Sequence, residues 1–424
     1  MPTLLQINVV SNLLSTGKIA EDIAKVAIAH GWKSYIAYGR DSKPSVSQEI
    51  KIGSKFEVYE HYALNKLFDC EGWASKTSTR KLVQQIAEIT PDIIQLHNIH
   101  DHYLNYPILF EYLTKSNVPV VWVQHDCWSF TGGCMYFDMF NCSKWKTECK
   151  DCPEKRALFG DNTTNHFRLK KQLLDAIPNL IFVPVSDWLH GLLSQSAQKH
   201  RPIITIHNGV DISRFKPMNS TIAKDKFRIL GVAAVWDKRK GLDDFIRLRE
   251  YLSDEFEITL VGLSQKQVDN LPAGIKGLTR TANVEELVQL YSDSDIFVNP
   301  TYSDNFPTTN IEALACGTPV ITYQTGGSPE AVDEKSGRVV PQGDLDALVA
   351  AIQKVKAQPF SSKDCRKRAV KLFDKDRCFE QYLKLYNILI NNCIGKFGGG
   401  KNVVAILNIL AVDSSFLSER RLAA

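Results

Sequence analysis

Short apolar runs that favour β-strands alternate with amphipathic helical stretches along this chain, and the series occurs twice. The apolar runs of the first series lie at 4–10, 34–38, 93–96, 118–123, 181–185 and 203–206. Those of the second series lie at 227–232, 257–261, 296–299 and 320–322. Continuously apolar strands, each followed by a helix, are typical of parallel sheets covered on both faces. The sequence therefore predicts an α/β protein with two doubly wound domains.

A polar stretch without periodicity, around Pro217, separates the two series. We expect an N-terminal domain over residues 1–217 and a C-terminal domain over 218–395, the latter ending in a helix from Asp376 to Ile394. The tail 396–424 changes character and has no predicted role. A chain of 424 residues is long enough for two domains of roughly 200 residues each.

Composition excludes several classes of protein. A formal net charge of +4 is too small to indicate nucleic-acid binding. The N-terminal residues lack the pattern of a secretory signal, and no apolar run reaches the ~18 residues that span a bilayer. Ten cysteines without such a signal favour reduced thiols or metal ligands over disulfides. We therefore expect a cytoplasmic protein that does not bind nucleic acid.

Residues 304–319 carry the most specific chemical pattern. Asp304 and Glu312 lie eight positions apart across a loop that enters a helix at about 310–315, which Gly317 and Pro319 then end. Backbone N–H groups at a helix N-terminus attract anions, while carboxylates accept hydrogen bonds from hydroxyl groups. A site for a phosphate attached to a sugar is the first hypothesis.

Two turns between a strand and a helix could bind the phosphate. Thr16 and Gly17 open a helix after the first strand, where glycine lets the backbone approach a phosphate. The alternative is a plain tight turn. In the second series, Lys238, Arg239 and Lys240 precede Gly241 at a helix entrance, where cations are unfavourable unless an anion offsets them. A solvated basic turn is the alternative there, and Lys240 is the preferred phosphate contact.

His125 and Asp126 follow the strand predicted at 118–123, so they lie at the edge of the sheet where ligands bind. A histidine at such a place is also common as a structural residue. His97, His100 and His102 follow another strand end, and we interpret them only as residues that could line a substrate site.

Four cysteines lie close together in an insert at about 127–160, with the spacing C-x7-C-x6-C-x2-C. They are Cys134, Cys142, Cys149 and Cys152. This set has the ingredients of a closed tetrahedral zinc site that would order the insert. A reduced cysteine-rich loop is the main alternative. A redox pair at Cys149 and Cys152, or a zinc finger that contacts nucleic acid, fits the pattern less well.

Taken together, these motifs resemble those of family 4 glycosyltransferases with the GT-B fold, over residues 1 to about 395. The matching segments are Ser15–Gly17, His125–Asp126, Val185–Leu189, His207–Asp211, Arg214–Phe215, Lys240–Gly241, Leu290–Asp295 and Asp304–Pro319. The stretch His125–Pro153 is similar to a bacterial subgroup with a cysteine-rich insert, which is linked to surface polysaccharide assembly.

The resemblance implies two Rossmann-like domains that face a central cleft, with a C-terminal helix that returns to the N-terminal domain. It implies a retaining, metal-independent hexosyltransferase whose C-terminal domain holds a nucleotide diphosphate sugar as donor. The acceptor would be a saccharide or a lipid-linked saccharide, and the enzyme could associate with the inner face of the plasma membrane. Apart from structural zinc, no cofactor is expected.

Site residues follow from the resemblance position by position. Glu312 is expected at the ribose hydroxyls and Asp304 near the hydroxyls of the donor sugar. Lys240, with Arg239, is expected at the diphosphate. The family's glycine loop falls on Thr16–Gly17, and its donor-side histidine falls on His125, with Asp126 beside it. The remaining donor contacts are expected at Asn305, Phe306, Thr308 and Thr309, the two threonines through their backbone N–H groups.

Three positions depart from the family pattern. Asp304 stands where glutamate is common, and Asn305–Pro307 replaces Gly-Phe-Gly, so that Pro307 has no N–H to offer. Val235 stands at the position of the family's arginine, whose charge Lys238 or Arg239 could replace.

Three other functions are compatible with parts of this pattern. A GT-B sugar-nucleotide 2-epimerase would need the nucleotide sugar but no acceptor. A non-enzymatic two-domain sugar-binding protein would bind without turnover. A zinc-stabilised nucleic-acid module is the weakest alternative, given the modest net charge.

Overall fold

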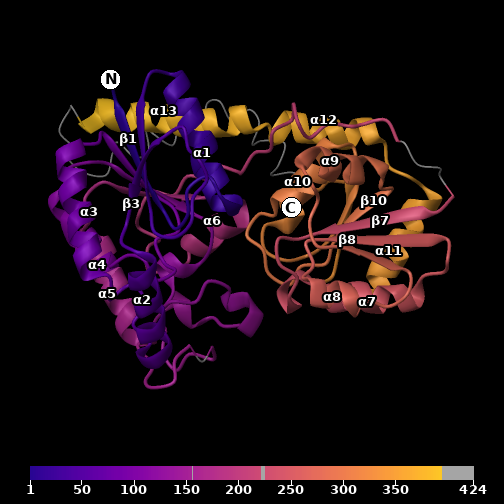
Figure 1. The fold of residues 1–424 in the computed structure, drawn as a ribbon, viewed down its shortest axis with the longest axis horizontal. Coiled ribbons are helices and arrows are strands. Elements are labelled where there is room, and N and C mark those ends of the chain that lie inside the picture. Colours follow the sequence, from indigo (N-terminus) through magenta and orange to yellow (C-terminus); the bar gives the residue numbers. More distant parts are fainter. Residues whose placement is uncertain (155, 221–224, 394–424) are drawn as a thin grey trace. The chain divides into compact units, whose positions relative to one another are not determined.

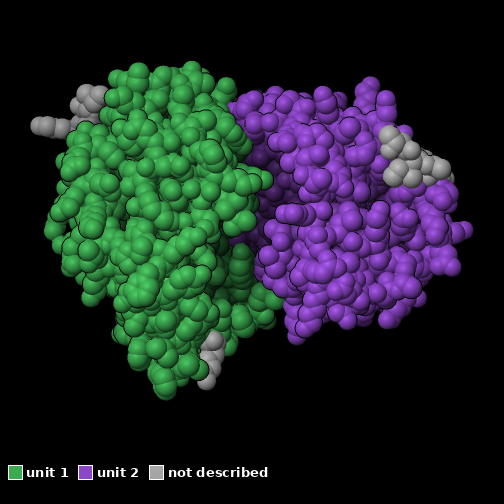
Figure 2. Space-filling view, viewed as in Figure 1, with its two compact units in different colours: residues 1–185, 189–206, 379–424 green, residues 186–188, 207–378 purple. Residues whose placement is uncertain are grey.

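The computed structural model describes residues 1–154, 156–220 and 225–393, so the tail 396–424 lies outside the described residues. The chain forms two compact units (Figure 2). Unit 1 comprises Met1–Val185, Leu189–Ile206 and the chain from Phe379, and unit 2 comprises Ser186–Trp188 and His207–Cys378. Unit 2 takes in residues before the expected boundary at 217 because the backbone of Val210 pairs with that of Asp374.

Unit 1 is built on a six-stranded sheet in the order β3-β2-β1-β4-β5-β6, in which every pairing is parallel. Its strands are β1 (Thr3–Asn8), β2 (Lys33–Tyr38), β3 (Gln48–Lys51), β4 (Ile93–Leu96), β5 (Val120–Gln124) and β6 (Leu180–Pro184). Its helices are α1 (Leu14–Ala29), α2 (Lys55–Phe68), α3 (Lys76–Ile89), α4 (Tyr106–Lys115), α5 (Thr163–Ala176) and most of α6 (Asp187–Leu193) and α13 (Lys375–Cys393). Helices α1 and α13 cover one face of the sheet, and α3, α4 and α5 cover the other (Figure 1).

Unit 2 repeats this design with the parallel order β12-β11-β10-β7-β8-β9. Its strands are β7 (Phe227–Val232), β8 (Phe256–Val261), β9 (Ile275–Leu278), β10 (Ile296–Asn299), β11 (Val320–Tyr323) and β12 (Gly337–Val340). Its helices are α7 (Leu242–Tyr251), α8 (Gln265–Asp269), α9 (Val284–Asp293), α10 (Thr308–Ala315), α11 (Leu345–Ala357) and α12 (Ser362–Leu372). Fully buried Phe245, Leu248, Ile258 and Ile352 belong to its core.

The predicted α/β class with two doubly wound domains is confirmed, with local differences. The run at 203–206 is not a strand, since Ile203 makes only a single bridge to Phe182. Three short strands, β3, β9 and β12, were not predicted. Each lies at the edge of its sheet and carries exposed or half-buried side chains, so none forms a continuous apolar run.

The C-terminal helix α13 belongs to unit 1 from Phe379 onward, which confirms the expectation that it returns to the N-terminal domain. The Tyr386 hydroxyl donates a hydrogen bond to the side-chain oxygen of Gln95 on β4. The ring of Tyr386 also lies 5.5 Å from that of Trp32. Among the described residues, none of the helices combines the length and apolar composition needed to cross a bilayer.

In both units the chain reverses its direction of progress across the sheet between two neighbouring strands. These strands are β1 and β4 in unit 1, and β7 and β10 in unit 2. Ligands of open α/β sheets bind beyond the carboxyl ends of the strands at such a switch point. A ligand-binding site is therefore expected in the loops that follow these four strands.

Candidate functional site

At the switch point of unit 2, a lysine after β7 meets an aspartate after β10. The Lys240 ammonium forms an ion pair with the Asp304 carboxylate. Their side chains are only 19% and 15% exposed, so the pair is largely shielded from water. The structure thus brings together two residues that are 64 positions apart and were both predicted as site residues.

The turn that carries Lys240 is fixed by close backbone contacts. It is a 3-10 turn, η4 (Lys238–Lys240), whose Lys240 N–H donates to the Asp237 carboxylate at 3.1 Å. Gly241 has φ +73, and a Cβ there would lie 2.1 Å from the Pro300 carbonyl oxygen. Glycine is therefore required where the β7 turn packs on the end of β10.

Arg239 joins the same two loops. Its carbonyl accepts a hydrogen bond from the Tyr302 N–H at 2.7 Å, and its guanidinium donates to the Ser303 carbonyl at 3.0 Å. The basic turn is therefore held against the loop after β10.

Two glycines that sequence reasoning missed support the Asp304 loop from behind. Gly326 has φ +54, and a Cβ there would lie 1.9 Å from the Asp304 carbonyl oxygen. The Gly327 N–H donates to that oxygen at 3.1 Å, and a Cβ on Gly327 would lie 2.1 Å from the Asn305 carbonyl oxygen. The pair Gly326-Gly327 directly after β11 is the sequence signal that could have identified this support.

Helix α10 begins at Thr308, two residues earlier than the predicted start at Asn310. The residue before it, Pro307, provides no side-chain cap. The first-turn N–H groups of a helix, which include those of Thr308 and Thr309, have no acceptor within the helix itself. Buried Asn310 anchors this turn by donating to the Ser328 hydroxyl at 3.0 Å and accepting from Asn299 at 2.8 Å.

Glu312 lies one turn inside α10 and is half-buried. The Tyr291 hydroxyl donates to one of its oxygens at 3.0 Å. Burial and the nearby carboxylate raise the pKa of Tyr291 well above its ordinary value, so the hydroxyl keeps its proton and fixes the orientation of Glu312. Tyr291 was not predicted as a site residue.

The two residues after Asp304 are buried. The Phe306 ring packs 5.0 Å from His207 and 5.7 Å from Phe373. Its side chain therefore fixes the loop, and only its backbone remains for a ligand contact. Nearby, Glu330 bonds His207 at 2.9 Å and accepts the backbone N–H groups of Asp187 and Trp188, which accounts for the close approach of Asp187, His207 and Glu330.

In unit 1, Thr16 and Gly17 lie inside the first turn of α1, which begins at Leu14. Asn8, the last residue of β1, donates to the Thr16 hydroxyl at 3.4 Å. A Cβ on Gly17 would lie 3.1 Å from the Val10 side chain, so this turn packs tightly on the loop after β1.

His125 follows β5, as predicted, and stacks on His97 after β4. Their ring nitrogens are 3.0 Å apart, and His97 also contacts the Gln6 amide oxygen at 3.0 Å. Burial lowers the pKa of His125 to about 4 and also lowers that of His97. Both imidazoles are therefore neutral at pH 7 and form part of a buried network that sequence reasoning did not foresee.

Asp126 pairs with His100 at 2.7 Å and accepts the Trp128 N–H at 2.9 Å. Burial opposes a charge on His100, but the Asp126 and Glu71 carboxylates outweigh it and raise the pKa of His100 to about 9. A buried imidazolium–carboxylate pair thus lies beside the neutral histidine pair. Glu71 was not predicted as part of this cluster.

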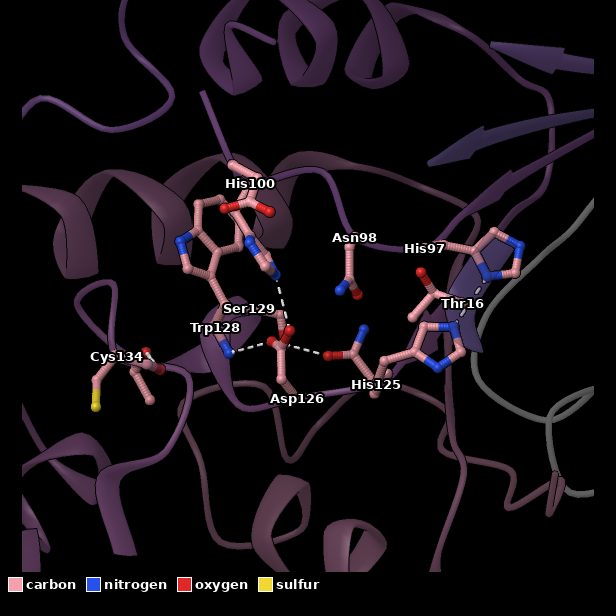
Figure 3. Close-up of polar contacts among 12 residues, drawn as sticks. Thr16, His97, Asn98, His100, His125, Asp126, Trp128, Ser129 and Cys134 are labelled. Carbon is pink, nitrogen blue, oxygen red and sulfur yellow. Dashed lines mark hydrogen bonds and ion pairs between the residues drawn. The ribbon is translucent and has the colours of Figure 1, made fainter. Parts of the chain in front are cut away.

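These groups surround one small recess at the ends of β4 and β5. In Figure 3, His97 and His125 lie at one end, His100 and Asp126 lie at the other, and Asn98 lies between them. Of the three histidines interpreted as substrate-lining, His97 and His100 line the recess. His102 instead contacts Asn65 at 3.0 Å, and it follows Asp101 in a strained stretch with φ +82 and +68.

The four clustered cysteines lie around a second pocket of unit 1. It has a volume of about 380 Å³ and is lined by Cys134, Cys142, Cys149 and Cys152, among other residues. All four thiols are free of disulfides. Among the described residues, however, no three of these sulfur atoms lie within 4.8 Å of one another, so the tetrahedron of a metal site is not closed.

Models of two protein families match this chain. One, described as Glycosyltransferase Family 4, matches residues 16–214, and the other, described as Glycosyl transferases group 1, matches residues 226–358. Together they cover every strand of the two sheets except β1.

Curated relatives agree with the family models. WcaC of Escherichia coli (strain K12), named as a glycosyl transferase of colanic acid biosynthesis, is 24% identical over 413 residues, which cover 91% of this chain and 100% of the relative. The capsular polysaccharide biosynthesis glycosyltransferase CapM of Staphylococcus aureus is 23% identical over 49% of this chain and 61% of its own length.

Solved structures share the fold. Sucrose-phosphate synthase from Thermosynechococcus elongatus superposes with a TM-score of 0.71 at 18% identity, over 92% of this chain and 100% of the other. Anabaena Alr3699/HepE in complex with UDP superposes with a TM-score of 0.65 at 16% identity, over 91% and 100%. It has also been crystallised in complex with UDP-glucose.

Proposed function

This chain is a family 4 glycosyltransferase with the GT-B fold, and we propose that it transfers a hexose from a nucleotide diphosphate sugar to a saccharide or lipid-linked saccharide in polysaccharide biosynthesis. The donor would bind in unit 2. The observation that carries this proposal is the shielded Lys240–Asp304 pair at the switch point, directly before the N-terminus of α10.

The donor site contains a group for each part of a nucleotide sugar. Lys240 and the first-turn N–H groups of Thr308 and Thr309 suit the diphosphate, because helix N-termini and cations both attract phosphate. Asp304 suits the hydroxyls of the sugar, and Glu312, oriented by Tyr291, suits those of the ribose. On binding, the Lys240–Asp304 ion pair would exchange for a lysine–phosphate and a carboxylate–hydroxyl contact.

The same groups account for catalysis. As the glycosidic bond to phosphate breaks, negative charge grows on the leaving diphosphate, so a cation held beside it stabilises the transition state more than the bound donor. Lys240, Arg239 and the α10 N-terminus would supply that charge without a metal ion. Attack from the same face, with the leaving phosphate taking the acceptor proton, would retain the anomeric configuration.

The recess of unit 1 suits the hydroxyl-rich acceptor. Its neutral imidazoles and amides can both donate and accept hydrogen bonds, and Asp126 adds a carboxylate that His100 holds in place. An assembly role with lipid-linked acceptors would place the enzyme in the cytoplasm, at the inner face of the membrane.

The proposal is tested by incubating the purified protein with a panel of UDP-, GDP- and ADP-hexoses and measuring nucleotide release. One donor should give slow release that rises at least tenfold when saccharide or lipid-linked acceptors are added, and EDTA should leave the rate unchanged. Release without any acceptor effect, or conversion of the sugar within an intact nucleotide sugar, would contradict transfer and favour an epimerase.

A variant locates the donor site within the same assay. Glu312→Ala should raise the KM for the donor at least tenfold, because two charge-assisted hydrogen bonds to the ribose are lost. The matched control is Glu334→Ala, an exposed glutamate of unit 2 away from α10. An unchanged donor KM in Glu312→Ala would remove α10 from the proposed site.

A further inference from the structure

The insert between β5 and α5 has little regular structure, yet several of its aromatic side chains are buried. Within the described residues, 127–162 contains only three 3-10 turns, η1 (Trp128–Phe130), η2 (Phe137–Phe140) and η3 (Lys144–Lys146). Trp145 is nevertheless 2% exposed and packs 4.9 Å from the Phe137 ring. Because the insert has only three short turns, few backbone hydrogen bonds offset the conformational entropy that it loses on folding.

The insert folds its four clustered cysteines around one pocket. Cys134, Cys142, Cys149 and Cys152 lie in the irregular segments beside the three turns and line the same pocket. Its aromatic walls include Phe137 and Trp145. Four free thiols that converge on one aromatic-walled pocket are the donor set of a structural zinc site, in which coordination by four cysteine sulfurs is common.

Backbone N–H groups point at three of these sulfurs. The Tyr136 amide bonds the Cys134 sulfur, and the Glu154 amide bonds the Cys152 sulfur, each from two positions further along the chain. The Gly132 amide bonds the Cys149 sulfur. Burial nevertheless raises the pKa of all three thiols, so they keep their protons until a metal binds.

The surrounding charge also suits a bound anion. Four thiolates around Zn²⁺ carry a net charge of −2, which buried cations must offset. The Arg156 guanidinium acts on Cys152, and the Lys170 ammonium, 1% exposed, acts on Cys149. The Glu154 carboxylate, near Cys134 and Cys152, acts in the opposite direction, as does burial of the thiols.

From these observations we propose that Cys134, Cys142, Cys149 and Cys152 bind one structural zinc ion. Each thiol would release its proton to solvent and form one Zn–S bond, with no change of oxidation state. Zn–S bonds of about 2.3 Å separate sulfurs by about 3.8 Å in a tetrahedron, so the thiols must move inward from their present spacing. Side-chain rotation on short turns can supply that movement.

Zinc would act on the reaction only indirectly, by positioning the strand end that carries Asp126. The insert starts directly after Asp126, and its first turn donates the Trp128 N–H to that carboxylate at 2.9 Å. Lys170 then fixes the same turn by donating to the Trp128 carbonyl at 2.5 Å. Loss of zinc should therefore loosen the acceptor recess of unit 1 and leave the donor site of unit 2 in place.

The test is metal analysis of the full chain, purified without chelator from cells supplied with zinc. About one zinc per chain is expected. The variant Cys149→Ser/Cys152→Ser should contain less than a tenth of that amount, whereas Cys70→Ser, a half-buried free cysteine outside the insert, should retain all of it. A zinc-free wild type, or zinc retained by the double variant, would overturn the proposal.

A second measurement does not depend on whether the variants fold. The wild-type chain, after zinc is exchanged for Co²⁺, should show the intense visible bands of a tetrahedral cobalt–thiolate site, and its four insert thiols should resist alkylation until the metal is removed. Cobalt bands of an octahedral oxygen site, rapid alkylation of the insert thiols in the loaded protein, or a disulfide detected in the intact mass would each contradict the assignment. None of these outcomes bears on the donor site proposed in unit 2, so the two proposals can fail separately.

Discussion

The two sheets share one topology, yet their switch points contain different chemistry. After β7 and β10 in unit 2 lies a shielded lysine–aspartate pair beside a helix N-terminus. After β1 and β4 in unit 1, Asn8 bonds Thr16 and the N–H of Asn98, neutral His97 bonds His125, and the charge of His100 is offset by Asp126. The fold fixes where a ligand can bind, and the loop residues decide which one. Charge suits a diphosphate, and neutral donors and acceptors suit sugar hydroxyls.

The distribution of histidines follows the same division. All ten histidines lie in the described part of the chain. Nine of these belong to unit 1, and His207 belongs to unit 2. Burial lowers the pKa values of His61, His125 and His166 to about 4, all within unit 1. Unit 1 therefore carries a histidine-based sensitivity to mild acid that unit 2 largely lacks.

The largest expected difference between the units is their response to acid. Below pH 6.5 the imidazoles of the unfolded chain take up protons, while those held near pKa 4 in the fold do not. The stability that they contribute is present above pH 6.5 and is lost as the pH falls through 4, by up to about 1.4 kcal/mol per pH unit for each group. Unit 1 should unfold at lower urea concentration at pH 5 than at pH 7, well before unit 2.

The measurement is urea unfolding at several pH values, followed by a brief hydrogen-exchange pulse at one fixed pH and mass spectrometry of peptides from each unit. His125→Gln should reduce the acid sensitivity of unit 1, and His200→Gln, an exposed control 52% accessible at its side chain, should not. Equal acid sensitivity of the two units would contradict the expected difference in stability between them.

Removal of the lysine at the switch point of unit 2 should have the next largest effect. Lys240→Ala is expected to lower kcat/KM by about 10²–10³-fold, the usual cost of removing one preorganised group that stabilises transition-state charge. Lys238→Ala is the matched control, because it removes an exposed cation from the same turn. Steady-state kinetics with the active donor should show at most a twofold change for the control. Equal losses in both variants would mean that the total positive charge of the turn supports catalysis, and that Lys240 has no special position.

A glycine substitution tests whether the close backbone contacts of unit 2 are necessary. Gly326→Ala combines a left-handed φ with a Cβ that would lie 1.9 Å from the Asp304 carbonyl oxygen. Gly31→Ala in unit 1 has the same kind of φ, +80, but no atom within 4 Å of its Cβ. The control should lose about 1 kcal/mol of stability from backbone strain alone. Gly326→Ala should lose about 2–4 kcal/mol, and roughly tenfold in kcat/KM, because Asp304 is displaced.

Denaturant unfolding and donor kinetics measure both effects. If Gly326→Ala behaves like Gly31→Ala in both assays, the loop after β11 does not position Asp304.

The candidate site in unit 2 could be predicted from the sequence because its residues form local motifs, and its role in donor binding stays a prediction. Lys240 is next to the glycine that its turn requires, and Asp304 and Glu312 frame one short helix. The signals that were missed are also local, as Gly326 and Gly327 show. Tyr291 is different, since nothing near it in the sequence links it to Glu312, 21 positions away.

The network in unit 1 could not be predicted in the same way, because its contacts join distant parts of the chain. Gln6 and His97 are 91 positions apart, and Gln95 meets Tyr386 across 291 positions. A histidine after a strand shows where the imidazole lies but not whether it stacks, as His125 does, or forms an ion pair, as His100 does. Only the packed sheet determines these partners, and with them the charge of each group.

The most direct test of the account is a crystal structure of the chain soaked with UDP, the nucleotide seen with Anabaena Alr3699/HepE, or with the nucleoside diphosphate of the donor found active in the panel. We expect the diphosphate within hydrogen-bonding distance of the Lys240 ammonium and the Thr308 and Thr309 N–H groups, with the ribose hydroxyls on Glu312. A diphosphate bound instead among the histidines of unit 1, or anywhere away from α10, would contradict it.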